Sequence, residues 1–161
     1  MFTPESLLDL HARAHRSLRG IIRHCAELEP AAIDQELRGF GYPTVRLQLH
    51  HVVGAEEYWF GVLRGAFRDE DDAHLYPTIE AIEAFRERVA AESAAYLRDA
   101  KTPDLNAPRT MRTWGGRERS LVPAHVVLRT QTHLFHHQGQ VSAMCRLLGE
   151  PVPAGLDFPL D

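Results

Sequence analysis

Apolar residues recur at helical spacing in four long stretches of the chain. Within each stretch they return every three or four positions, which is the period of an amphipathic helix. Thr3 and Thr78 stand where helix N-caps are expected, and Gly65 and Gly149 stand where helices are expected to end. The pattern predicts helices over about residues 4–28, 43–64, 78–98 and 120–148.

The segments between these helices have the composition of loops. Residues 65–77 carry the acidic run Asp69–Asp72, which lacks the spacing of a calcium-binding loop and is expected to be solvated. Residues 101–119 are expected to form a loop with a short hairpin at Gly115–Gly116. The proline-rich tail after Gly149 is expected to pack loosely on the surface.

Length and composition are consistent with one compact domain over residues 1–161. Apolar residues make up 44% of the chain, charged residues 25%, and the formal net charge is −4. Four long amphipathic helices without a convincing strand run predict an all-α fold, a four-helix bundle.

The same composition argues against several classes of partner. No basic stretch is interleaved with aromatic residues, so no nucleic-acid surface is expected. No apolar stretch approaches the roughly 20 residues that span a bilayer, so no membrane association is expected. The N-terminus lacks the pattern of a signal peptide, and Cys25 and Cys145 fall inside predicted helices without a disulfide framework. We therefore expect a cytoplasmic protein.

Histidines are the residues that carry candidate chemistry, and the chain has 10 of them. His133 and His137 are four positions apart on the fourth predicted helix, so their side chains project from one face. That face is otherwise apolar, which directs both imidazoles into the bundle. Two imidazoles placed in this way can bind one metal ion from one side.

Helical phase then selects a third histidine on the second predicted helix. His51 shares its face with apolar residues, whereas His50 shares a face with charged residues and is expected to face solvent. Bundle metal sites are built from facing helices, so His51, His133 and His137 form the predicted ligand set. Three neutral nitrogen ligands favour Zn²⁺ or Ni²⁺ and leave a coordination position open for water or substrate.

The remaining histidines have simpler interpretations. His11 lies on the apolar stripe of the first helix with His15 at its edge, where a histidine is most often a core residue with a satisfied hydrogen bond. Four others are interpreted as surface or cap residues: His50, His74, His125 and His136.

Two segments resemble the DinB-like four-helix-bundle proteins. One is residues 41–59, with a histidine followed by a glutamate and an aromatic pair, and the other is residues 132–149, with His-x3-His and a following Gly-Gln. Matched residue by residue, the family's metal ligands correspond to His51, His133 and His137. The chain departs from the family at Gln138, where an arginine is usual, which puts into question an outer-face salt bridge.

The resemblance implies more than the ligand set. It implies up-down-down-up topology, a divalent metal ion, frequent homodimers, and for some members a thiol-dependent S-transferase activity with a low-molecular-weight thiol. It also implies that Gly139 permits close helix approach and that Gln140 lies near the inward face.

Three functions remain open at this stage. In the first, the metal activates a thiol or water in a transferase or hydrolase, with His11 as candidate base and His15, Tyr58 and Trp59 as candidate pocket residues. In the second, the bundle binds a metal or ligand without catalysis, as a stress-response module. In the third, the histidines form a polar core network without a metal.

Overall fold

Threonine caps start three of the four long helices. The computed structural model describes residues 1–68 and 72–160. The hydroxyls of Thr3, Thr44 and Thr78 accept hydrogen bonds from the backbone N–H groups three residues further on. They precede α1 (Pro4–Ala26), α3 (Val45–Arg64) and α4 (Ile79–Asp99), and the fourth long helix is α6 (Pro123–Leu147).

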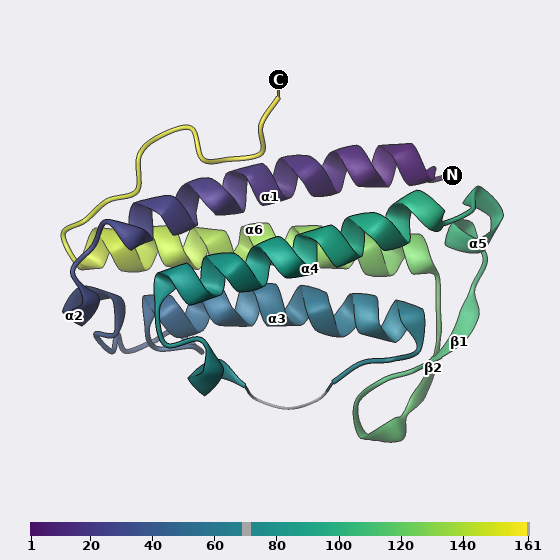
Figure 1. Ribbon diagram of the computed structural model, residues 1–161, viewed down its shortest axis with the longest axis horizontal. Helices are drawn as coiled ribbons and strands as arrows, with labels where there is room; N and C mark the ends of the chain where they lie inside the picture. Colours follow the sequence, from purple (N-terminus) through teal and green to yellow (C-terminus); the bar gives the residue numbers. More distant parts are fainter. Residues whose placement is uncertain (69–71, 161) are drawn as a thin grey trace.

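The four long helices lie side by side as a bundle, as the apolar pattern predicts (Figure 1). α1 runs parallel to α6, because Ser17 lies beside Gln138 and Cys25 beside Cys145. The two cysteines are free thiols in the core, with 4.0 Å between their sulfur atoms.

α3 and α4 both run opposite to α1 and α6. Gln48, near the start of α3, contacts α6 near its end, whereas Trp59, near the end of α3, contacts Arg129. His50, near the start of α3, lies beside Phe85 of α4, and Arg64 at the end of α3 lies beside Glu92, so α3 and α4 are parallel (Figure 1). The topology is therefore up-down-down-up.

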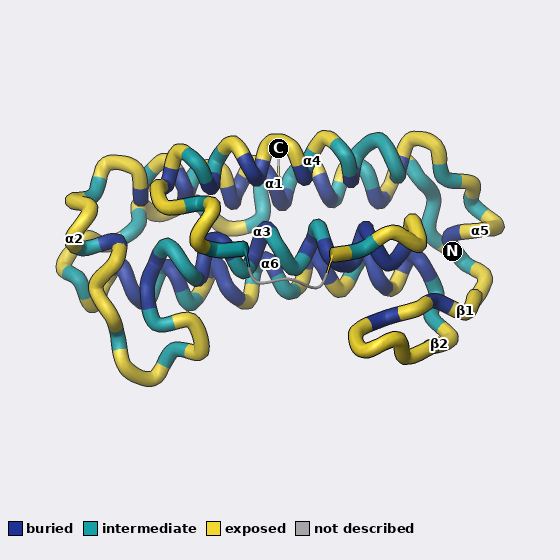
Figure 2. The backbone as a smooth tube through the Cα atoms, turned by 60° about the horizontal axis from the view of Figure 1, so that its bottom comes forward, coloured by how far each residue is buried: buried dark blue, intermediate teal, exposed yellow. Residues whose placement is uncertain are grey.

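Two apolar clusters fill the interior, one toward each end of the bundle. Figure 2 shows that buried stretches recur along the long helices. Ile21, Leu49 and Ile82 belong to the first, and Leu7 and Phe60 to the second. Between these clusters the helices contribute buried polar residues, which we call the polar layer: His11, His15, Glu56, Ser93, Thr130 and Gln131. Apolar packing does not explain the polar layer.

Short elements occupy the connections. The expected hairpin is present, with β1 (Arg109–Arg112) antiparallel to β2 (Glu118–Leu121). Gly115 and Gly116 form its turn with φ of 61° and 72°, a region that favours glycine. Because β2 takes up residues 118–121, α6 starts three residues later than the pattern suggests. The other short helices are α2 (Pro30–Ile33), η1 (Ala73–Leu75), α5 (Thr102–Asn106) and η2 (Trp114–Gly116).

The C-terminal tail is held against α1, so the expectation of loose packing is wrong. Ser17 Oγ donates to the Leu156 carbonyl at 2.5 Å, and the Arg13 guanidinium donates to the Pro159 carbonyl at 3.0 Å. The Gln138 amide, where the family pattern has arginine, is buried and donates to Ser17 Oγ and to the Leu156 carbonyl. Gln138 therefore anchors the tail from inside and forms no outer-face ion pair.

No helix in the described part of the chain is long and apolar enough to cross a membrane. A Cβ added at Gly139 would meet nothing within 4 Å, so this glycine does not serve a close helix approach.

A close backbone approach is instead found at Gly61, where the segment after α3 folds back against the end of that helix. A Cβ there would lie 2.8 Å from Phe67 Cα, which is backbone and cannot rotate away. We expect Gly61→Ala to lower the free energy of unfolding by about 1–3 kcal/mol in chemical denaturation. Gly139→Ala is the control and should be neutral or stabilising by up to about 1 kcal/mol. Equal stability of both variants would contradict the close approach.

Candidate metal centre

The three histidines selected by helical phase converge on the seam between α3 and α6. His51 Nε2 lies 3.3 Å from His133 Nε2, and His137 Nε2 lies 3.0 Å from the same atom. One ring nitrogen from each residue lies within 4.8 Å of the other two, so the group could hold a metal ion. The three side chains meet because α3 and α6 pack against each other in opposite directions. The turn of α3 that carries His51 then lies against the turn of α6 from His133 to His137.

The surroundings keep these imidazoles neutral. Burial lowers the pKa of His51 to about 4, with further lowering by the charges of His137 and His50. Burial, then His137 and His51, lower the pKa of His133 to about 3. The pKa of His137 is also lowered, by burial and then by His136. At neutral pH each ring is therefore neutral, which is the protonation state that binds metal.

His51, His133 and His137, which we call the trio, remain accessible from one side. His51 and His133 are only partly buried, whereas His137 is buried. The Tyr42 ring, in the segment before α3, stacks on the His51 ring with 3.9 Å between centroids and 21° between planes. Tyr42 is itself partly exposed, so a ligand could approach the trio past this ring.

A buried glutamine near the start of α3 forms a hydrogen bond with one histidine of the trio. Gln48 lies three positions before His51, and its Nε2 donates to His137 Nδ1 at 2.9 Å. In the sequence, Gln48 could be noticed as a polar residue on the inward face of α3. Its position did not indicate that His137 is its partner.

A second group of potential ligands lies inside the polar layer. It consists of His11, His15 and Glu56, and we call it the second convergence. Glu56 accepts hydrogen bonds from His11 Nε2 at its Oε1 and from His15 Nε2 at its Oε2, both at 2.9 Å. All three side chains are buried, and their ligand atoms lie within 4.8 Å of one another, so this group too could hold a metal ion. Sequence reasoning singled out both histidines but missed Glu56, whose only signal was an acidic residue on an inward face.

Hydrogen bonding explains the second convergence without a metal ion. The Arg86 guanidinium donates to His15 Nδ1 at 3.5 Å, which leaves the proton of a neutral ring on Nε2, facing Glu56. Burial alone would raise the pKa of Glu56, but the adjacent His15 and His11 outweigh it and hold that pKa well below its usual range. Both Glu56 oxygens accept a hydrogen bond from a histidine, and Arg86 lies behind His15, so hydrogen bonds within the protein satisfy the carboxylate. His11 thus faces Glu56 and not the trio.

His50 corrects a sequence expectation. We expected it to face solvent, but it is buried and donates to Asp72 at 3.0 Å. The cause is the part of the α3–α4 connection that contains Asp72 and Tyr76, because both residues lie against the His50 ring. Residues 69–71 of the acidic run lie outside the described residues. His74, His125 and His136 are exposed, as expected.

The two aromatic candidates lie further along the same seam. Tyr58 stacks on Trp114 with 4.2 Å between ring centroids and accepts a hydrogen bond from the Trp114 backbone. Trp59 lies under the guanidinium of Arg129, 5.0 Å from it, one turn of α6 before His133. Trp59 and Arg129 are therefore the nearer pair, and Tyr58 mainly packs the hairpin against α3.

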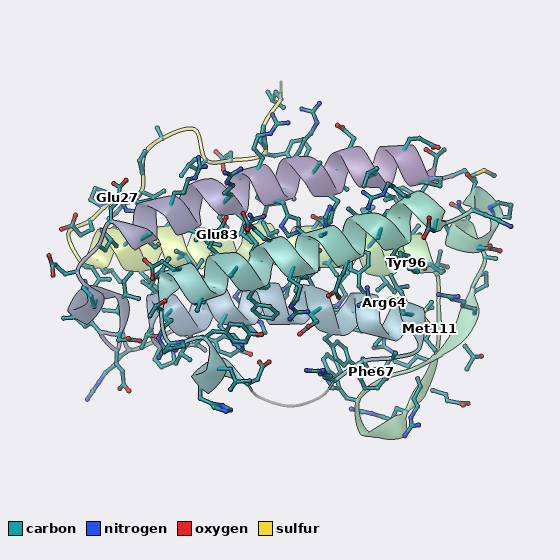
Figure 3. The ribbon with its side chains drawn as sticks, viewed as in Figure 1. Glu27, Arg64, Phe67, Glu83, Tyr96 and Met111 are labelled. Carbon is teal, nitrogen blue, oxygen red and sulfur yellow. The ribbon has the colours of Figure 1, made fainter. Side chains whose placement is uncertain are left out.

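A cavity lies elsewhere in the molecule, away from these histidines. It measures about 650 Å³ and lies at the end of the bundle near α5 and β1. Arg64 and Tyr96, labelled in Figure 3, are two of its lining residues. None of the three histidines lines it, and its lining charges of both signs favour no single ligand class.

These observations define a class, a helical bundle with a histidine-lined candidate metal centre on facing helices. The model of the DinB family matches residues 1–161, and the chain belongs to the DinB family.

Comparison with solved structures agrees with this fold. The crystal structure of a DinB-like protein from Bacillus cereus ATCC 10987 matches with a TM-score of 0.73 and 19% sequence identity. The match covers 93% of this chain and 95% of that one. At this identity the likeness shows the fold alone. No curated protein matches the chain.

The two interpretations of the second convergence differ in a measurable way. Replacing Glu56 by glutamine leaves a buried histidine N–H facing an amide N–H, so we expect Glu56→Gln to cost about 2–4 kcal/mol of unfolding free energy. Metal content, measured on tag-free protein, should stay at that of the wild type. Glu57→Gln, which affects the partly exposed pair with Arg88, is the control and should cost less than about 1 kcal/mol. Loss of one metal equivalent in Glu56→Gln would show a second metal site instead.

The lowered histidine pKa values predict how the metal-free protein responds to pH. Between pH 6.5 and 4.5 the unfolded chain protonates its histidines, whereas the folded trio, with pKa values of about 4 for His51 and about 3 for His133, does not. The unfolded state then binds more protons, so the free energy of unfolding should fall as pH decreases through this window. His133→Gln should flatten the fall, as measured by denaturation at several pH values. An unchanged slope would mean that the trio is already protonated in the folded state.

Proposed function

We propose that this protein binds a divalent metal ion through His51, His133 and His137 and uses the open coordination position for chemistry on a thiol or water. The observation that carries the proposal is the convergence of three neutral Nε2 atoms at a site where two of the rings remain partly exposed. Ligation from facing helices with a free position is typical of reactive metal sites and not of structural ones.

The donor set favours certain metals. Three imidazoles without a thiolate or carboxylate match Zn²⁺ or Ni²⁺ better than Mg²⁺ or Ca²⁺, which prefer oxygen ligands. When bound, such an ion lowers the pKa of a coordinated thiol or water and so supplies a nucleophile at neutral pH. The activity that fits is a thiol-dependent S-transferase or a hydrolase.

Arg129 and Tyr42 are the residues best placed to bind the substrate. The positive charge of Arg129 is close enough to His133 to contribute to its lowered pKa, and the guanidinium is exposed over Trp59. It would bind a carboxylate, which low-molecular-weight thiols such as glutathione carry. Tyr42 would pack against the substrate chain while holding the His51 ring in place. We leave His11 out of this assignment, because its Nε2 is engaged by Glu56.

The experiment combines metal analysis with a thiol screen. Tag-free protein, with and without Zn²⁺ or Ni²⁺, is scanned thermally against bacillithiol, mycothiol, coenzyme A and glutathione. A thiol at about 100 times its Kd adds about 2.7 kcal/mol, which for a domain of this size is roughly 5–10 °C. We expect one of these thiols to give such a shift only when the metal is present.

Two variants serve as matched controls on α6. His137→Ala should weaken metal binding by more than about 100-fold, beyond the range seen for partners outside the ligand set, and should abolish the thiol shift. His125→Ala, on the exposed side of the same helix, should behave as wild type. Full metal content in His137→Ala would refute the ligand assignment. Metal binding without any thiol shift would favour a non-catalytic metal-binding bundle.

A further inference from the structure

Behind the trio, a chain of side chains links a metal-facing histidine to solvent. It runs from His137 through Gln48 and Gln140 to His136, and we call Gln48, Gln140 and His136 the amide relay. Gln48 is completely buried, Gln140 is partly buried and His136 is exposed. The amide relay therefore spans from the core to the surface in three side chains.

The hydrogen bonds of the amide relay all have one polarity. Gln48 Nε2 donates to His137 Nδ1 and also to Gln140 Oε1, and Gln140 Nε2 donates to His136 Nε2 at 3.0 Å. A neutral imidazole carries one proton, so a His137 that accepts at Nδ1 holds its proton on Nε2. That proton faces His133 Nε2, 3.0 Å away.

This polarity is incompatible with ligation through His137 Nε2. A metal ligand must present a lone pair, and the opposite ring nitrogen then carries the proton and donates it to a neighbour. His137 Nδ1–H would need an acceptor, and Gln48 offers one only if its oxygen replaces its nitrogen. Gln140 must then donate to that oxygen, and His136 must donate to the oxygen of Gln140.

We propose that the amide relay reverses when the metal binds, and that its polarity sets the affinity of the trio for the ion. The proposal rests on the proposed function, because it requires that the trio binds metal. In the reversed state each histidine still has one proton: that of His137 has moved from Nε2 to Nδ1, and that of His136 from Nδ1 to Nε2. Gln48 is thus a positioning residue, acting on the metal through His137.

The reversal requires little rearrangement. The nitrogen and oxygen of a carboxamide are nearly the same size, so a half-turn of each amide exchanges donor and acceptor in place. Among the described residues, Gln48 Oε1 is a buried atom without a hydrogen-bond partner, so the present polarity is not locked by a further contact. His136, at the exposed end, can exchange its proton with water.

Replacing each glutamine in turn by glutamate distinguishes the effect of hydrogen-bond polarity on metal binding from the effect of added negative charge. Gln48→Glu places an acceptor against His137 Nδ1 and favours the metal-binding tautomer. Gln140→Glu places an acceptor against Gln48 Nε2, holding Gln48 as a donor to His137 and favouring the other tautomer. Both add the same negative charge near the site, so simple electrostatic attraction would strengthen metal binding in both.

The readout is Zn²⁺ affinity by competition with a chromophoric chelator at pH 7.5. We expect Gln48→Glu to bind Zn²⁺ at least as tightly as wild type and Gln140→Glu to bind it about 10–100-fold more weakly, the range for partners that orient a ligand. Changes of the same sign in both variants would overturn the inference, and so would a Gln140→Glu that binds as tightly as wild type.

Nitrogen-15 NMR of the histidine rings gives a second readout without metal or activity. In the metal-free wild type and in Gln140→Glu, His137 should be protonated on Nε2, and in Gln48→Glu on Nδ1. The same His137 tautomer in all three proteins would overturn the inference. A wild-type protein that takes up no Zn²⁺ would refute the proposed function, and the inference with it. Retained Zn²⁺ uptake with same-sign changes would refute the inference alone.

Discussion

A charged carboxylate buried in the middle of the bundle constrains the packing of the helices around it. Glu56 on α3 is held by His11 and His15 of α1, and Arg86 of α4 completes the network behind His15. Leaving such a charge without partners costs several kcal/mol, so a one-turn slip of α1 against α3 is strongly unfavourable. The apolar clusters above and below could tolerate such a slip far better, because hydrophobic contact is not directional. The polar layer therefore sets the register of α1 against α3.

The two groups of potential ligands share one local pattern but differ in their chemistry. Each pairs two histidines four residues apart on one helix with a single residue of α3, either His51 or Glu56. In the polar layer the α3 residue is an anion, and each of its two carboxylate oxygens accepts a hydrogen bond from a histidine. On the α3–α6 seam the α3 residue is a third neutral imidazole, so the group contains no anion, and part of it faces solvent. Charge and exposure, more than residue type, separate a structural network from a candidate metal centre.

Much of the site followed from helical phase. The periodicity of α3 and α6 was sufficient to choose His51, His133 and His137, because a residue's direction on a helix depends on its number alone. The same reasoning was wrong for His50, whose face is covered by a distant segment. It also gave no role to Gln138, which faces the tail, and it missed Glu56, since a buried acid is expected only once its partners are known.

The sequence by itself determined the four long helices, the caps at Thr3 and Thr78, the hairpin turn and the inward direction of His51, His133 and His137, since these depend on contacts within a few residues. Tertiary structure decided which histidines meet, which carboxylate they share and which face of α3 is covered. It also decided that Gln48 touches His137 across two helices. Such pairings join residues far apart in the chain, and they depend on helix register and direction, which no local pattern encodes.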